Sequence, residues 1–142
     1  MKLAEKLKTM SDEQATKEEV VTNEIVNFFA EKFTNGEMME AFEKSIWKED
    51  ICSRKKSLSL DFWTYMPGCS ETYFGLLGKE WKPENGCSYE YKKVNLKNIY
   101  KDVLLKIAEL ARENFGKEGF EVEVRPNERN KRYETYIIEI SW

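Results

Sequence analysis

Apolar residues recur at helical spacing through the first third of the chain. Between about 17 and 34 they return every three or four positions, which is the pattern of an amphipathic helix. Asn35-Gly36 ends this pattern, because both residue types tolerate the left-handed conformation that follows many helices. A second helix is predicted from about 37 to 49. Together the two helices predict an N-terminal αα-hairpin.

The pattern before residue 16 is weaker. Leu3, Leu7 and Met10 would line one side of a short helix, yet a frayed segment fits the same residues. Thr16 begins a sequence typical of a helix-capping box, which favours a helix start at that point. We therefore expect a flexible or short helical N-terminus over 1–15.

The period changes from 3.6 to 2 after residue 56. In residues 57–66 apolar residues alternate with Ser59, Asp61, Trp63 and Tyr65, which predicts a strand with one apolar face. The next twenty residues are rich in glycine and proline and predict a long loop with one short strand. Residues 87–94 predict a further strand.

The last third predicts one long helix and a closing pair of strands. Asn95 is a good helix cap, an apolar stripe follows it, and Gly116 marks the end. Two alternating segments then flank a polar turn, which is typical of a hairpin. We expect an α+β fold: an antiparallel sheet of about four to five strands, a long helix packed on one face, and the N-terminal αα-hairpin. A single domain over 16–142 would hold the helical hairpin in 16–50 and the sheet with the long helix in 56–142.

The amino-acid composition excludes several classes of protein and of catalytic or metal site. The chain has 142 residues, and its hydrophobic fraction of 41% excludes a disordered protein. It contains no histidine. That excludes Ser-His-Asp triads, Cys-His dyads and histidine zinc sites. Three single cysteines do not suggest a disulfide framework or a zinc motif.

The net charge and the absence of targeting signals limit the kinds of partner and the cellular location that we expect. The net charge is −3, with 7 basic and 12 acidic residues in 1–50, and 16 and 14 in 51–142. This balance is neither that of a dedicated duplex-DNA binder nor that of a strong DNA mimic. The chain shows no secretion signal and no apolar run long enough to span a membrane, so we expect a cytoplasmic protein.

Two groups of residues are candidates for binding a partner. Trp63 and Tyr65 fall on the non-core face of a predicted strand, where aromatic residues indicate either an exposed anchor or a face covered by the helical hairpin. The closing hairpin adds a basic tip, which would clamp phosphates or carboxylates and offers an aromatic ring for stacking. The tip residues are Arg125, Arg129, Lys131, Arg132 and Tyr133.

A set of carboxylates shares the same predicted face. Carboxylates that converge can bind a hard cation or divide acid and base roles, although glutamate is also ordinary on a solvated sheet. No spacing resembles a known metal loop, so neither a metal nor a cofactor is expected. The set is Asp61, Glu121, Glu123 and Glu139.

These observations favour a small non-enzymatic binding protein that inhibits or occludes another protein. Its size, its lack of catalytic motifs and its bias toward Lys, Asn and Ile resemble small accessory proteins of phages and mobile elements. Such proteins inhibit host defence nucleases, as anti-CRISPR proteins do, neutralise toxins, or sequester nucleotides. The alternatives are a nucleic-acid or nucleotide binder that uses the basic tip, and a metal-dependent enzyme that uses the carboxylates. A homo-oligomer is compatible with each.

Overall fold

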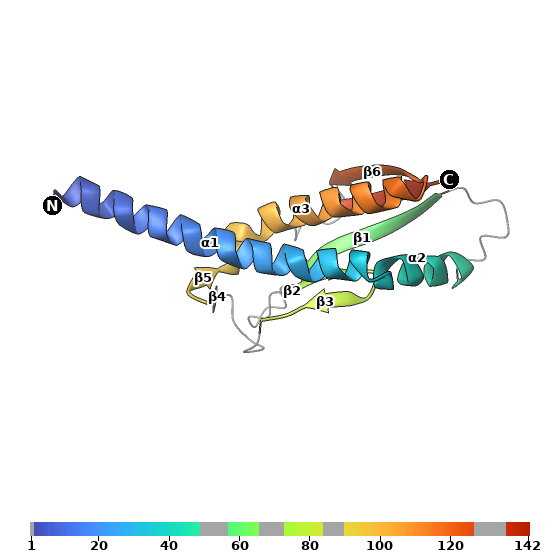
Figure 1. The fold of residues 1–142 in the computed structure, drawn as a ribbon, viewed down its shortest axis with the longest axis horizontal. Helices are drawn as coiled ribbons and strands as arrows, with labels where there is room; N and C mark the ends of the chain where they lie inside the picture. Colours follow the sequence, from blue (N-terminus) through green and yellow to red (C-terminus); the bar gives the residue numbers. More distant parts are fainter. Residues whose placement is uncertain (1, 49–56, 66–72, 84–89, 127–135) are drawn as a thin grey trace.

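The computed structural model describes residues 2–48, 57–65, 73–83, 90–126 and 136–142, and Figure 1 gives their arrangement. These residues form three helices and seven strands. The helices are α1 (Leu3–Thr34), α2 (Glu37–Lys48) and α3 (Leu96–Lys117). The strands are β1 (Ser57–Tyr65), β2 (Tyr73–Leu76), β3 (Lys79–Trp81), β4 (Glu90–Tyr91), β5 (Val94–Asn95), β6 (Glu121–Pro126) and β7 (Tyr136–Ser141). The chain is therefore a mixed helix and strand protein.

Helix α1 is continuous from Leu3 to Thr34, so the residues of 1–15 that the structure describes, where we expected a flexible or short helical N-terminus, are helical and continue into the same long helix. It contains 32 residues, and its first turns project beyond the other elements (Figure 1). The hydroxyls of Thr9, Thr16 and Thr22 each donate to the carbonyl oxygen four residues earlier, at 2.8–3.0 Å. Thr16 therefore lies inside the helix and does not cap a new one, because a capping residue needs non-helical backbone angles.

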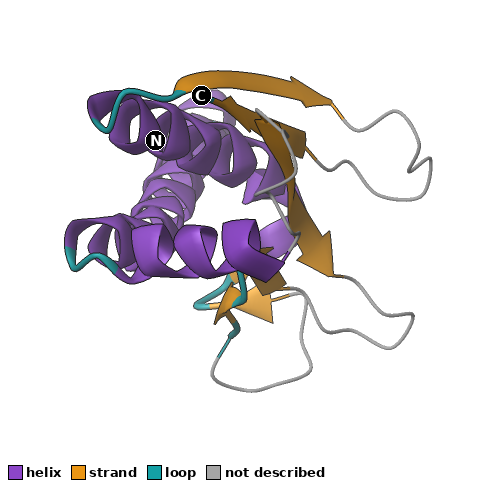
Figure 2. Cartoon of the chain, turned by 90° about the vertical axis from the view of Figure 1, so that its right-hand side faces the viewer, coloured by secondary structure: helices purple, strands orange, loops and turns teal. Residues whose placement is uncertain are grey.

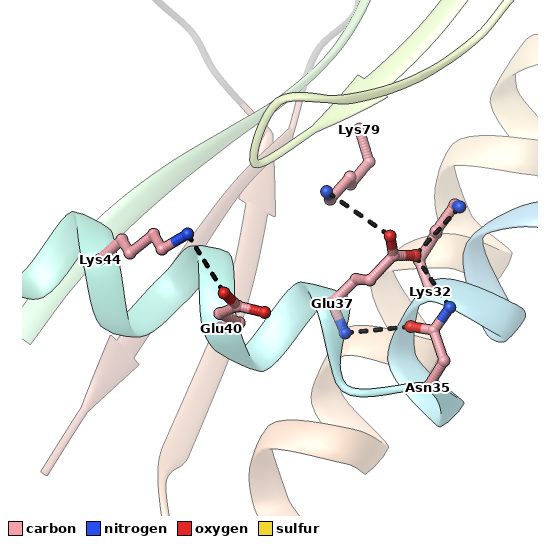
Figure 3. A network of polar contacts seen from close by, with 6 residues as sticks. All are labelled: Lys32, Asn35, Glu37, Glu40, Lys44 and Lys79. Atoms are coloured by element: carbon pink, nitrogen blue, oxygen red, sulfur yellow. Dashed lines mark hydrogen bonds and ion pairs between the residues drawn. The ribbon is translucent and has the colours of Figure 1, made fainter.

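The turn between α1 and α2 is held by a local polar network, drawn in Figure 3. The backbone of Gly36 takes a φ of 85°, in the left-handed region that glycine accepts without strain. Asn35 Oδ1 accepts from the Glu37 backbone N–H at 3.0 Å, and Asn35 Nδ2 donates to Glu37 Oε2 at 2.8 Å. The ammonium of Lys32 lies 3.0 Å from the same carboxylate. The expected pair of helices joined by this turn is present.

Strand pairing corrects the expected sheet of four to five strands lying side by side. The strands are joined in the order β3-β2-β1-β7-β6, and every pair is antiparallel. However, β1 pairs with β7 over its first six residues, Ser57 to Phe62, and with β2 only from Trp63 to Tyr65. Two groups of three strands, β3-β2-β1 and β1-β7-β6, therefore share β1, because this strand is long enough to pair with β7 along one part and with β2 along another.

The segment predicted as a strand over 87–94 differs as well. Its described part forms a separate two-stranded ladder of β4 and β5, which pairs with no strand of the larger sheet. Lys92 and Lys93 make the turn between them, with φ of 50° and 64°. Two consecutive residues with positive φ are what a tight two-residue hairpin requires.

The core lies between the helices and one face of the strands. Figure 2 shows the three helices gathered on the same side of the strands. The ring of Phe115 is fully buried, and its centroid lies 5.9 Å from that of Phe33 in α1 and 4.9 Å from that of Phe42 in α2. Ile138 and Ile140 of β7 are also fully buried. Because the helical pair lies in this layer, the alternative in which it covers the opposite face of the sheet is wrong.

Candidate functional site

Strands β6 and β7 present one face to the core and another away from it. Val122 and Val124 are half-buried against the core, whereas Glu121, Glu123 and Arg125 of the same strand are exposed. In β7 the fully buried isoleucines alternate with half-buried residues in the same way. This alternation follows from the period of two in a strand. We call the surface away from the core the outer strand face: Glu121, Glu123, Arg125, Ile137 and Glu139.

Charge on the outer strand face is organised around one ion pair. Glu123 is registered directly opposite Glu139, and like charges in that position repel. Arg125 relieves the repulsion, because its Nη1 lies 3.0 Å from Glu139 Oε2. The side chains of Arg125 and Glu139 are 46% and 28% exposed, so the pair stays in contact with water. The face holds one cation and three carboxylates, and its cation is already engaged.

The register of β1 places the predicted aromatic residues relative to this face. Asp61 is paired with Ile137, which is in turn paired with Arg125, so these three positions form one row across the sheet. Trp63 lies two positions further along β1 and is paired with Gly75 of β2. Tyr65 is paired with Tyr73 at the far end of that ladder. The backbone therefore brings Asp61 next to the outer strand face, and Trp63 follows it where β1 passes from β7 to β2.

The carboxylate set does not form a metal site in the described part of the chain. Glu123 and Glu139 are brought together, but Arg125 neutralises one of them. Glu121 is registered with Ser141 at the end of the strand pair. Within the described residues, no group of three or more carboxylate, cysteine or histidine side chains is arranged to hold a metal ion.

Most of the basic tip lies outside the described residues. Arg129, Lys131, Arg132 and Tyr133 fall in 127–135, outside the described residues. The three cysteines, at 52, 69 and 87, fall outside them as well. Arg125, the first residue of the predicted tip, lies in β6 and is placed. Partner binding by the tip thus stays a prediction.

Lys92, in the turn between β4 and β5, contacts α1. Its ammonium lies 3.2 Å from Glu24 Oε2, and the hydroxyl of Tyr91 donates to Glu24 Oε1 at 2.8 Å. The hydrogen bond to Glu24 raises the pKa of Lys92, and burial together with the same carboxylate raises the pKa of Tyr91. Both groups stay protonated at neutral pH. Lys92 therefore holds the β4–β5 hairpin to the helix.

Two surface features were missed by the sequence reasoning. The first is a shallow groove of about 570 Å³ between α1 and α3, with Val26, Leu105 and Leu110 in its lining and a rim of alternating charge. Leu105 is 42% exposed there. The sequence feature that could have indicated this groove is Leu105, an apolar residue next to the main apolar stripe of α3. The second is the projecting start of α1, whose apolar positions were recognised but not their place in a continuous helix.

Comparisons with known proteins found nothing similar to this chain. Neither the family models, nor the curated proteins, nor the solved structures contain a match to this chain. Among the described residues, no helix combines the length and apolarity that a membrane crossing requires. The function must therefore be argued from the surfaces themselves.

Proposed function

We propose that this protein is a non-enzymatic binding protein that occludes a protein partner with its outer strand face. The observation that carries the proposal is that α1, α2 and α3 all pack on one side of the strands, and no described element covers the other side (Figure 2). A two-layer protein can use such a face for recognition while its core stays intact. Trp63 and Tyr65, with the tip residues Arg129, Lys131, Arg132 and Tyr133, extend this surface in the proposal.

The charge on the described part of the outer strand face supports a basic protein partner over a nucleic acid. Three carboxylates and one arginine lie on the described part of the face, and the arginine is paired with Glu139. A phosphate backbone would be repelled by this arrangement. A basic surface would be attracted, and Ile137 at the centre supplies an apolar contact that a partner can desolvate.

Such a face suits an inhibitor of an enzyme that binds nucleic acid. Nucleases carry basic surfaces for their substrate, and an acidic strand face of this kind would block one without imitating a whole duplex. In this proposal the target is a host defence nuclease or a toxin. The protein itself needs no catalytic group, since it acts by occupying the surface.

The test is capture of a partner by variants with matched changes of charge. Wild-type protein is incubated with lysate of a low-GC bacterium, with and without nuclease treatment; bound proteins are identified by mass spectrometry and bound nucleic acid by absorbance. Glu123→Lys should lose the partner, because it reverses charge at the centre of the outer strand face. Glu31→Lys makes the same charge change on an exposed position of α1 and should keep it. Thermal unfolding of both variants should match wild type within a few degrees.

Three results would overturn the proposal. One is retention of the same partner, with the same yield, by Glu123→Lys. Another is recovery of nucleic acid alone, lost on nuclease treatment, which would support the nucleic-acid alternative. The third is loss of the partner with Leu105→Asp but not with Glu123→Lys, which would move the binding site to the groove between α1 and α3.

A further inference from the structure

The projecting start of α1 carries an apolar seam that is exposed to solvent. Leu3, Leu7 and Met10 are 69%, 54% and 56% exposed, and every residue from 2 to 13 is exposed to solvent. They follow one another at intervals of four and three, the spacing of a coiled-coil seam. We call residues 3–14 of α1 the arm. Exposed apolar positions aligned on one side of a helix favour a partner that packs on them.

Charge along the arm is segregated. Residues 2–8 hold Lys2, Lys6 and Lys8 with one glutamate, for a net charge of +2. Residues 9–15 hold Asp12 and Glu13 and no basic residue, for a net charge of −2. A second arm in the antiparallel direction would place each basic half beside an acidic half. A parallel arrangement would place like charges together, which is unfavourable.

We propose that two copies of this chain pair through their arms in an antiparallel coiled coil. The inference goes beyond partner binding by the outer strand face, since it uses a different element and a different occupant. In the register that fits best, Leu7 of one copy packs against Met10 of the other, and Leu3 lies beside Gln14. Lys6 then flanks the same layer as Glu13 of the other copy, and the symmetry makes this ion pair twice.

The free length of the helix agrees with this register. The body of the protein begins to contact α1 at Gln14, whose Nε2 donates to the carbonyl oxygen of Lys93 at 3.4 Å. The overlap needs residues 3–14 of each copy, which is the stretch that projects beyond the β4–β5 hairpin (Figure 1). Longer overlap would bring the second arm onto that hairpin.

The surface on which the arm of the second copy would end has a charge that complements the lysine at the start of that arm. A recess of about 510 Å³ lies beside Gln14, and Glu18, Glu90 and Lys93 contribute to its lining. In the proposed register Lys2 of the second copy reaches this side of α1, at the level of residue 15. Two carboxylates against one ammonium make the recess favourable for a lysine.

The experiment measures the monomer–dimer equilibrium by sedimentation at low salt. Wild type should associate reversibly to twice the monomer mass, and added salt should weaken the dimer. Lys6→Glu and Glu13→Lys should each weaken association about tenfold, because each turns two attractive pairs into repulsive ones. The double variant Lys6→Glu/Glu13→Lys should restore association. Lys8→Glu is the matched control, since it makes the same charge change on the side of the arm away from the seam, and it should weaken association far less than Lys6→Glu does.

Other outcomes overturn the proposal. A wild-type protein that stays monomeric at all accessible concentrations excludes the dimer. Stronger association of Glu13→Lys indicates parallel arms, where Glu13 would face Glu18 of the other copy. Association that survives Leu7→Ser indicates a different interface, because that variant should weaken the proposed one about a hundredfold. Binding of the arm to anionic vesicles at the expense of the dimer would identify a lipid surface as the occupant. Glu123→Lys should dimerise normally, so that failure of this proposal and failure of the proposed function are told apart.

Discussion

The hydroxyl of Tyr91 donates a 2.8 Å hydrogen bond to Glu24, and this contact fixes the β4–β5 hairpin against the middle of α1. The ring of Tyr91 is buried and stacks edge-on against Trp81, with centroids 5.2 Å apart. One side chain thus connects a strand of the larger sheet, a separate hairpin and the longest helix. The position of the arm relative to the body depends on this connection.

Replacing Tyr91 by Phe tests the contribution of that hydrogen bond. The ring packing is kept while the donor is lost, so the free energy of unfolding should fall by about 1 kcal/mol in urea titrations. Glu24→Gln retains an oxygen acceptor and should cost less. Equal stability of Tyr91→Phe and wild type would show that the bond contributes nothing.

Arg125 should stabilise the strand pair mainly through charge. Arg125→Ala leaves Glu123 and Glu139 opposite each other without a cation, so stability should fall by about 0.5 kcal/mol at low salt. The difference should shrink in high salt because the repulsion is screened. Adding Glu123→Gln to Arg125→Ala should recover most of the loss. A loss that does not respond to salt would instead indicate lost packing of the arginine stem.

Stability in acid should depend on Glu37. The hydrogen bond from Lys32, and then that from Asn35, lower the pKa of this carboxyl from its ordinary value of 4.5 (Figure 3). The folded state therefore releases this proton more readily than the unfolded state. The resulting stability is present above about pH 4.5 and is lost as the pH falls through the lowered pKa. Glu37→Gln should be less stable than wild type near neutral pH, and thermal unfolding should show the two converging in acid.

A second variant checks the assigned cause. Lys32→Gln removes the first of the two donors and should reduce the same pH-dependent difference between wild type and Glu37→Gln. A difference that persists unchanged at the acid end would contradict the role given to the Glu37 carboxylate.

The β4–β5 turn should tolerate glycine better than the residue it has. Lys93 has a φ of 64°, which strains a residue with a side chain. Lys93→Gly should raise the free energy of unfolding by about 1 kcal/mol. The same substitution at Lys101, exposed within α3, should lower it by about 1 kcal/mol. Opposite signs at the two positions would confirm the turn geometry, whereas two losses would contradict it.

Features set by neighbouring residues were predictable. The stripe that begins at Leu96 and the cap at Asn95 predict α3, and in the structure Asn95 Oδ1 accepts from the Lys97 backbone N–H at 3.0 Å. Alternation predicts β6 and β7 and the faces of their residues, including the shared face of Glu123, Arg125 and Glu139. Each of these follows from periods of 3.6 or 2, which a short stretch of sequence contains in full.

By itself, then, the sequence determined the class of the fold, the elements with clear periodicity and the chemistry that the absence of histidine excludes. Only the tertiary structure decided that α1 continues through Thr16, that β1 is shared end to end by two ladders, and that all three helices lie on one face. These are outcomes of contacts between residues far apart in the chain, such as Trp63 with Gly75 and Gln14 with Lys93. Packing of this kind outweighs local propensity. Whether a capping sequence starts a helix, or whether one strand pairs with two others, is therefore decided only when the whole core forms.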